Sequence, residues 1–87
     1  MVKLIDFWAP WCGPCKIMNP IIEELEKELE GQVKFEKINV DENQAMAQQY
    51  GVMSIPTYII LDQSGKEVAR KIGVTAKEDL RKLLQVS

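Results

Sequence analysis

The amino-acid sequence predicts an α/β protein with one mixed sheet of four strands and three flanking helices. Segments with the apolar patterns of strands alternate along the chain with segments whose apolar residues recur at helical spacing. The length of 87 residues leaves room for one hydrophobic core. No repeat or flexible linker divides residues 1–87. We therefore expect a single domain with the order β-α-β-α-β-β-α, two helices on one face of the sheet and one on the other.

The first strand is predicted at residues 2–9, which form a nearly unbroken apolar run with one acid, Asp6, inside it. Such a run is typical of a central strand that is buried on both faces. The first helix is predicted at residues 14–30, with Gly31 as its stop. Its inward stripe should consist of Ile17, Met18, Ile21, Ile22, Leu25 and Leu29. Pro20 should kink this helix, because proline supplies no amide hydrogen to the helical ladder.

A second strand is predicted at residues 32–40, followed by a short helix. Asp41 or Asn43 can cap this helix, which should end near Tyr50 with Gly51 as its stop. A third strand is expected at residues 57–61.

The C-terminal part should add an antiparallel strand and a helix. Residues 62–65 have the composition of a turn, from which residues 66–72 return as the fourth strand. Thr75, with Glu78 three residues later, predicts a capping box at the start of the last helix. The residues of that helix expected to face inward are Leu80, Leu83 and Leu84.

Composition and charge argue against several classes of function. The formal charge is −2 and the basic residues are scattered, so we expect neither a nucleic-acid partner nor an anionic membrane partner. No apolar run approaches about 18 residues, and the N-terminus does not have the pattern of a signal peptide. A cytoplasmic location is therefore expected. Histidine is absent, and two cysteines cannot form a closed four-cysteine site within one chain, so no metal site is expected.

The two cysteines lie where the first strand meets the first helix, in the segment Trp11-Cys12-Gly13-Pro14-Cys15. At a helix N-terminus, unpaired amides and the helix dipole favour negative charge, so the pKa of Cys12 should lie below the free-thiol value of about 8.5. Cys15, one turn further on, should be more buried. Gly13 keeps the approach open, and Pro14 supplies a helical φ without losing a needed amide. An attacking outer sulfur and a resolving inner sulfur suit exchange through a mixed disulfide.

Three other interpretations of the cysteine pair compete with redox chemistry. A structural disulfide that closes so short a loop adds about 2 kcal/mol in the chain-entropy model, and such crosslinks are uncommon in cytosolic proteins. The pair could also be half of an intermolecular metal site, or two buried free thiols. The strand-to-helix position favours the redox interpretation.

Asp6 is the most informative acid because it lies in a predicted core strand. Burial disfavours the charged form, so the pKa of this carboxyl should be raised. Lys37, on the neighbouring strand, could pair with Asp6 and tune it. The alternative to a catalytic role for Asp6 is a buried ion pair or a structural hydrogen bond.

The segment at residues 6–16, Asp-Phe-Trp-Ala-Pro-Trp-Cys-Gly-Pro-Cys-Lys, closely resembles the active-site segment of the thioredoxin family. Further matches follow in the family's order at residues 37–41, 50–52 and 55–57 and at Gly73, so the resemblance covers essentially the whole chain. It implies a protein-disulfide reductant without a cofactor beyond the Cys12–Cys15 pair. It also implies disulfide-containing proteins as substrates and a separate thioredoxin reductase-type electron donor.

The resemblance further implies roles for individual residues. Asp6 would lie behind Cys15 and accept its proton when the mixed disulfide is resolved. A cis peptide is expected before Pro56, beside the cysteines; proline is where cis bonds occur. Trp11 should flank the nucleophile at the surface, while Trp8 is expected in the core.

An apolar rim that docks an extended peptide is expected near the cysteines. Its members would be Ile55, Pro56, Gly73 and Val74, with the backbone of Ile55 hydrogen-bonded to the peptide as in strand addition. Simple packing of these loops is the alternative.

The sequence departs from the family's pattern in two ways. Thioredoxins usually begin with an extra strand and helix, whereas this sequence starts at the active-site strand, and the remaining core matches a glutaredoxin-like arrangement with strand order 2-1-3-4. The second strand, residues 33–39, would then be an edge, where the charges of Lys34, Glu36 and Lys37 discourage pairing with other chains. Ser54 stands where many relatives have glycine, which can alter contacts with partners.

We therefore predict a monomeric dithiol–disulfide oxidoreductase in which Cys12 attacks and Cys15 resolves. One alternative is a glutaredoxin-like reductant recharged by glutathione, against which Trp11 and the Gly13-Pro14 pair argue because they match thioredoxins. Another is a module in which the two cysteines bind zinc or an iron–sulfur cluster across a dimer. A scaffold with incidental thiols would keep all its function after the substitution Cys12→Ser.

Overall fold

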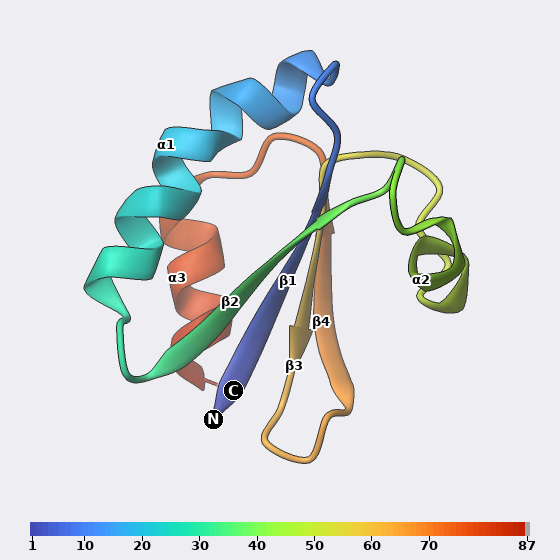
Figure 1. The fold of residues 1–87 in the computed structure, drawn as a ribbon. Coiled ribbons are helices and arrows are strands. Elements are labelled where there is room, and N and C mark those ends of the chain that lie inside the picture. Colours follow the sequence, from blue (N-terminus) through green and yellow to red (C-terminus); the bar gives the residue numbers. More distant parts are fainter. Residues whose placement is uncertain (87) are drawn as a thin grey trace.

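The computed structural model describes residues 1–86 and shows one sheet with helices on both faces (Figure 1). Its elements in chain order are β1 (Val2–Trp8), α1 (Gly13–Glu28), β2 (Val33–Asn39), α2 (Gln44–Gln49), β3 (Thr57–Leu61), β4 (Glu67–Ile72) and α3 (Lys77–Val86). The predicted order β-α-β-α-β-β-α is thereby confirmed. No helix within residues 1–86 is long and apolar enough to cross a membrane.

The strands form one sheet in the order β2-β1-β3-β4, as predicted. β1 runs parallel to β2 and antiparallel to β3, and β4 is antiparallel to β3. Helices α1 and α3 cover one face and α2 covers the other (Figure 1). This central position explains the near-continuous apolar run of β1, because a strand with packed elements on both faces needs apolar side chains on both.

The sheet separates two unequal hydrophobic clusters. The larger cluster lies under α1 and α3 and contains Val2, Leu4, Met18, Ile22, Leu25, Leu29, Val33, Tyr58, Ile60, Leu80 and Leu84. The smaller cluster lies under α2 and contains Ile5, Phe7, Ile38, Ile59 and Leu61. Helix α2 contributes only partly buried side chains to it and has no fully buried residue.

The inward stripe of α1 differs from the predicted one at its first position. Ile17 is 60% exposed, whereas Met18, Ile22 and Leu25 are buried. Successive helical residues point about 100° apart, so a stripe centred on Met18 and Ile22 turns Ile17 toward solvent. The helix continues through Pro20 and ends at Glu28, two residues before the predicted end. In α3, Leu80 and Leu84 are buried and Leu83 is partly buried.

The predicted side-chain cap of α2 is wrong, although Gly51, with φ of +65°, follows the helix as expected. Asn43 precedes the helix, but its side-chain amide donates to the Asn39 carbonyl oxygen at 3.1 Å and caps no helical amide. Asp41, the other candidate, instead accepts a hydrogen bond from the indole of Trp11 at 2.9 Å.

The predicted capping box of α3 is also wrong. The hydroxyl of Thr75 donates to the Gly73 carbonyl oxygen at 3.1 Å. The Thr75 amide donates to the sulfur of Met18 in α1 at 3.4 Å. The carboxylate of Glu78 forms an ion pair with Arg81.

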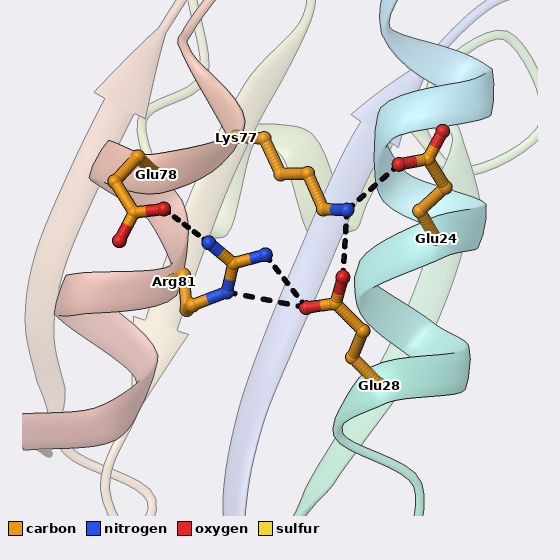
Figure 2. A network of polar contacts seen from close by, with 5 residues as sticks. All are labelled: Glu24, Glu28, Lys77, Glu78 and Arg81. Carbon is orange, nitrogen blue, oxygen red and sulfur yellow. Dashed lines mark hydrogen bonds and ion pairs between the residues drawn. The ribbon is translucent and has the colours of Figure 1, made fainter.

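A network of ion pairs joins α3 to α1 (Figure 2). Lys77 lies between two carboxylates of α1, 2.7 Å from Glu24 and 2.6 Å from Glu28. Arg81 binds Glu28 at 2.8 Å and also pairs with Glu78 of its own helix. Glu28 is the acceptor that Lys77 and Arg81 of α3 share on α1.

β2 is an edge strand of the described sheet, as predicted. Lys34 and Lys37 are exposed along it, and Glu36 forms an ion pair with Lys3 of β1. These charges line the open edge and are of the kind that discourages strand pairing with another chain.

Candidate active site

The cysteine pair lies at the N-terminus of α1, directly after β1 and a short turn. The amide of Cys12 donates to the Ala9 carbonyl oxygen at 3.2 Å, which closes that turn. Cys12 is the N-cap of α1, and its sulfur accepts a hydrogen bond from the amide of Cys15 at 3.2 Å. Pro14 occupies the first turn of the helix, where a missing amide costs nothing. The sulfur of Cys12 therefore takes the place of a capping oxygen, and the helix end supplies a donor that would stabilise its thiolate.

Cys12 and Cys15 form a disulfide, with their Cα atoms 5.3 Å apart. The structure thus holds the oxidised state of the pair. Cys12 is 3% exposed and Cys15 is 2% exposed, so the expected difference in burial is absent. Ala9 is buried with the pair, and partly buried apolar side chains from β1 and two loops (Trp8, Val40 and Ile55) pack against them. These neighbours bury most of both cysteine residues, which spacing along the helix alone does not reveal.

A cis peptide bond joins Ile55 to Pro56 beside the disulfide, as the resemblance implied. The sulfur of Cys12 lies 3.8 Å from the carbonyl oxygen of Ile55. Pro56 is fully buried, and its carbonyl oxygen accepts a hydrogen bond from the Gly73 amide at 2.8 Å. The segments before β3 and after β4 therefore meet next to the cysteines.

Asp6 is the buried acid of the site and is 3% exposed. It lies opposite Lys37 of β2 and Tyr58 of β3 in the strand register. Residues alternate along a strand, so Asp6 shares the face of Leu4, which is the face covered by α1. Burial raises the pKa of Asp6 from 3.8 to about 6, and the positive charge of Lys37 partly opposes this rise.

Tyr58 lies across from Asp6 and is 1% exposed. Burial, together with the nearby negative charge of Asp6, raises the pKa of this phenol well above its usual value. Tyr58 therefore stays protonated and uncharged across from the Asp6 carboxyl.

Lys37 is exposed on the edge strand, and its ammonium nitrogen lies 5.1 Å from the centre of a Trp8 ring. A cation at this distance from an indole face is attracted to it. Trp8 is half-buried rather than a core residue, because it covers the cysteines on one side and carries Lys37 on the other.

Trp11 is 68% exposed next to the nucleophile, as predicted. Its indole nitrogen donates to a carboxylate oxygen of Asp41 at 2.9 Å, which fixes the ring over a surface hollow of about 190 Å³. The residues that line the hollow are Trp11, Val40, Ala47, Val52, Met53, Ser54 and Ile55.

The hollow contains only part of the predicted rim. Trp11 and Ile55 line it, but Pro56 is buried and Gly73 contacts the site through its hydrogen bond to Pro56. Val74 is 58% exposed and is not part of the hollow. Gly13 is exposed, and a Cβ added there would meet no atom within 4 Å. The open approach expected at this glycine is therefore present.

The lining residues missed by sequence reasoning come from three segments. Val52 and Met53 lie just before Ile55 and next to Ser54, which the sequence had already singled out, so proximity in the chain was a usable signal for them. Asp41 and the lining residues from the segment before α2 and from α2 itself carry no such signal. Within residues 1–86, no group of three or more histidine, cysteine, aspartate or glutamate side chains could hold a metal ion.

Comparisons with known proteins match this geometry. The sequence matches the thioredoxin family over residues 1–86. It is 52% identical over 83 residues to a thioredoxin from Bacillus subtilis, covering 95% of this chain and 79% of that protein. For a thioredoxin from Rickettsia felis the identity is 52% over 77 residues, with 88% of this chain and 72% of that protein covered.

Solved structures show the same likeness. Thioredoxin NaTrxh from Nicotiana alata superposes with a TM-score of 0.89 at 42% identity, over 98% of this chain and 71% of that one. A further chain comes from a structure that describes thiol resolution in yeast mitochondrial 1-Cys peroxiredoxin via glutathione/thioredoxin systems. It superposes with a TM-score of 0.89 at 31% identity, over 99% of this chain and 78% of that one.

Proposed function

Because the chain belongs to the thioredoxin family and is a protein-disulfide reductase, we propose that its reaction cycle runs through Cys12, Cys15 and Asp6 in three distinct roles. The observation that carries this proposal is the Cys12–Cys15 disulfide at the N-terminus of α1, beside Ile55 and on the helix that covers Asp6. Each role follows from where the side chain lies.

The cycle begins with the reduced pair. The thiolate of Cys12 attacks one sulfur of a substrate disulfide, so a bond forms between the two sulfurs and the substrate S–S bond breaks. The released substrate thiolate takes up a proton. The amide of Cys15, which lies 3.2 Å from the Cys12 sulfur, supports the attacking thiolate before this step.

The second step resolves the mixed disulfide. The thiol of Cys15 gives its proton to the carboxylate of Asp6, and the resulting thiolate attacks the sulfur of Cys12. The Cys12–Cys15 bond forms, and the second substrate sulfur leaves and is protonated. The substrate gains two electrons and two protons, and the chain ends in the oxidised state that the structure describes.

Asp6 is suited to this exchange by its environment. A carboxyl with a pKa of about 6 can accept a proton and release it again near neutral pH. Lys37 keeps this pKa from rising further, because its positive charge favours the carboxylate. We assign Lys37 this tuning role, supported by its position opposite Asp6 in the register of β1 and β2.

The proposed substrates are other proteins with accessible disulfides, which approach the edge of the Cys12 sulfur over the hollow beside Trp11. A thioredoxin reductase-type enzyme would return two electrons to the disulfide. The relation to a chain described in a peroxiredoxin thiol-resolving system supports an oxidised thiol protein as one such substrate. The chain would act as a monomer, in a reducing compartment such as the cytoplasm.

The reduction potential of the pair is the first test. The protein is equilibrated in graded dithiol buffers, with the fluorescence of Trp11 beside the disulfide as the readout. We expect one reversible two-electron transition at a strongly reducing potential. An oxidising potential would instead indicate a protein that introduces disulfides, and the absence of a transition would contradict the cycle.

A trapping experiment tests the order of attack. Cys15→Ser should accumulate a mixed disulfide between Cys12 and a protein substrate, because the resolving sulfur is missing. The matched variant Cys12→Ser should accumulate none. Equal trapping by both variants would contradict the assignment of Cys12 as nucleophile. Recharging of the oxidised protein by thioredoxin reductase, but not by glutathione, would separate this function from a glutaredoxin-like one.

A further inference from the structure

Within the segment from Gly51 to Ile55, the last four residues form one wall of the hollow beside Trp11, and the segment ends next to the nucleophile. Met53 is 95% exposed and Ser54 is exposed, so neither side chain is anchored by burial. The end near the cysteines is held by the hydroxyl of Thr57, which donates to the Ser54 carbonyl oxygen at 2.7 Å. Val52 and Ile55 are partly buried, so the exposed middle of the wall depends in addition on what holds its other end.

Arg70 of β4 holds that other end. Its Nη2 donates to the Tyr50 carbonyl oxygen at 2.6 Å, and its Nη1 donates to the Gly51 carbonyl oxygen at 3.5 Å. These carbonyls lie at the C-terminus of α2, where helical carbonyl groups lack partners and a cation is favourable. The guanidinium is itself oriented by Glu67, which accepts from Nε and Nη2 at 2.9 Å each.

Helix α2 has few other contacts: the Tyr50 ring lies 5.8 Å from that of Phe7, Asn43 is bonded to the Asn39 carbonyl oxygen, and the Val52 amide donates to the Ala47 carbonyl oxygen at 2.9 Å. It has six residues, none fully buried, and it packs on the smaller cluster through partly buried side chains. A short helix of this kind is held by few contacts, so loss of the Arg70 bonds should shift α2 and the wall that follows it.

We propose that Arg70 is a positioning residue for protein substrates: it holds the carbonyl groups of Tyr50 and Gly51 and thereby fixes the wall against which a substrate chain docks next to Cys12. This inference rests on the proposed function. Arg70 has no contact with the disulfide and acts only through the segment from Gly51 to Ile55. A small disulfide can react with the Cys12 sulfur without docking against the wall. A protein substrate reacts with the same sulfur and also docks against the wall.

The test compares a protein disulfide with a small aromatic disulfide as substrates of Arg70→Leu. The ratio of kcat/KM for the protein to kcat/KM for the small compound should fall on the order of tenfold, because displacement of a docking surface by about 1 Å has effects of this size or larger. This loss should appear as a higher KM for the protein substrate. A ratio within twofold of the wild type would overturn the proposal.

Matched variants separate positioning from general damage. Lys71→Leu removes the neighbouring cation, which faces the other side of β4 because Lys71 lies opposite Tyr58 and Arg70 lies opposite Ile59. This control should leave the ratio unchanged. Arg70→Lys keeps the charge with fewer donors and should recover part of the ratio. Equal loss of the ratio in Lys71→Leu, or no recovery in Arg70→Lys, would contradict the role.

Two further measurements keep the outcome clear. If Arg70→Leu does not fold, Arg70→Gln takes its place, with amide hydrogen exchange of residues 51–55 measured in parallel. Faster exchange confined to this segment and α2 is expected, and unchanged exchange there would overturn the proposal. Failure of the proposed function is seen separately, because the wild-type protein would then reduce neither substrate.

Discussion

Asp6, the proposed proton acceptor, also carries a cost in stability. Its carboxyl is 3% exposed, and its pKa is raised by burial from 3.8 to about 6. A raised pKa means that the folded state disfavours the charged form. Well below pH 3.8 the carboxyl is protonated in both the folded and the unfolded state, and its burial carries no charge penalty. The penalty grows between pH 3.8 and about 6 and is complete above that range.

The substitution Asp6→Asn should therefore stabilise the protein in a pH-dependent way. At pH 8 we expect the free energy of unfolding to rise by up to about 3 kcal/mol, since one pKa unit corresponds to about 1.4 kcal/mol. At pH 3.5 this gain should vanish. Denaturant unfolding of both proteins at the two pH values measures it, and an equal difference at both would contradict the buried-charge explanation.

The same substitution should slow one chemical step selectively. Asparagine cannot accept the proton of Cys15 in the proposed cycle, so resolution of the mixed disulfide should slow by about 100-fold, while attack by Cys12 changes little. Stopped-flow fluorescence of Trp11 follows both phases. A similar slowing of both steps would count against proton transfer to Asp6.

Sequence reasoning found the cysteine pair and the buried acid because both have local signals. Cys12 and Cys15 were predicted as a redox pair from their spacing at a strand–helix junction, and the burial of Asp6 from its place within an apolar run, whereas its role as proton acceptor came from the family resemblance and stays a prediction. The contact between Trp11 and Asp41 joins residues 30 positions apart. Arg70 binds carbonyls about 20 positions away. Neither contact leaves a local pattern, so both required the structure.

Among the elements, α1 has the closest connection to the chemistry, and α3 holds it in place. Glu28 of α1 accepts from both Lys77 and Arg81 of α3, and these hydrogen bonds hold its pKa below the usual value (Figure 2). A lowered carboxyl pKa adds stability above the unfolded value, and that stability is lost as the pH falls through the folded value.

Glu28→Gln should lower Tm by a few degrees at neutral pH and low salt, because exposed pairs are individually weak but this carboxylate serves two cations. The difference should shrink in about 1 M salt, where exposed charges are screened, and at pH values low enough to protonate Glu28. Glu23→Gln, on an exposed part of the same helix, is the matched control. An identical decrease in the control would indicate a general charge effect instead.

The sequence predicted all seven helices and strands in the right order, but it did not predict the side-chain contacts at the helix ends. The predicted capping box at Thr75 failed because its hydroxyl has a nearer partner in Gly73 and its amide finds the sulfur of Met18, 57 positions away. The stripe of α1 was misplaced at Ile17, because apolar spacing alone does not fix the rotation of a helix on its sheet. Caps and rotations depend on tertiary partners that periodicity does not contain.

Across the whole molecule, the sheet divides the burial unequally. Eleven buried residues form the cluster on the α1 and α3 face, against five in the cluster on the α2 face, counted over the part of the chain that the structure describes. Side chains alternate between the two faces of the sheet along β1 and β3, so each of these strands contributes residues to both clusters. The apolar pattern predicted the layers, whereas the strand order rested on the resemblance to a known family.

Native-state hydrogen exchange should reveal this inequality. Amides of β1 and β3 should exchange only through global unfolding, since both strands are central and buried on both faces. Amides of α2 and residues 51–55 should exchange through local openings of much lower free energy. Equal protection of amides in α2 and in the central strands would contradict the unequal burial on the two faces of the sheet.

The lightly buried side has a consequence for protein engineering. Met53 and Ser54 lie at the rim of the hollow but outside both hydrophobic clusters. Libraries of variants at these two positions can therefore change which proteins are reduced without endangering folding. Substitutions at the buried positions of α1 have no such freedom. The choice of protein partner can be redesigned on the α2 side of the sheet, while α1 and the larger cluster on the other side are left unchanged.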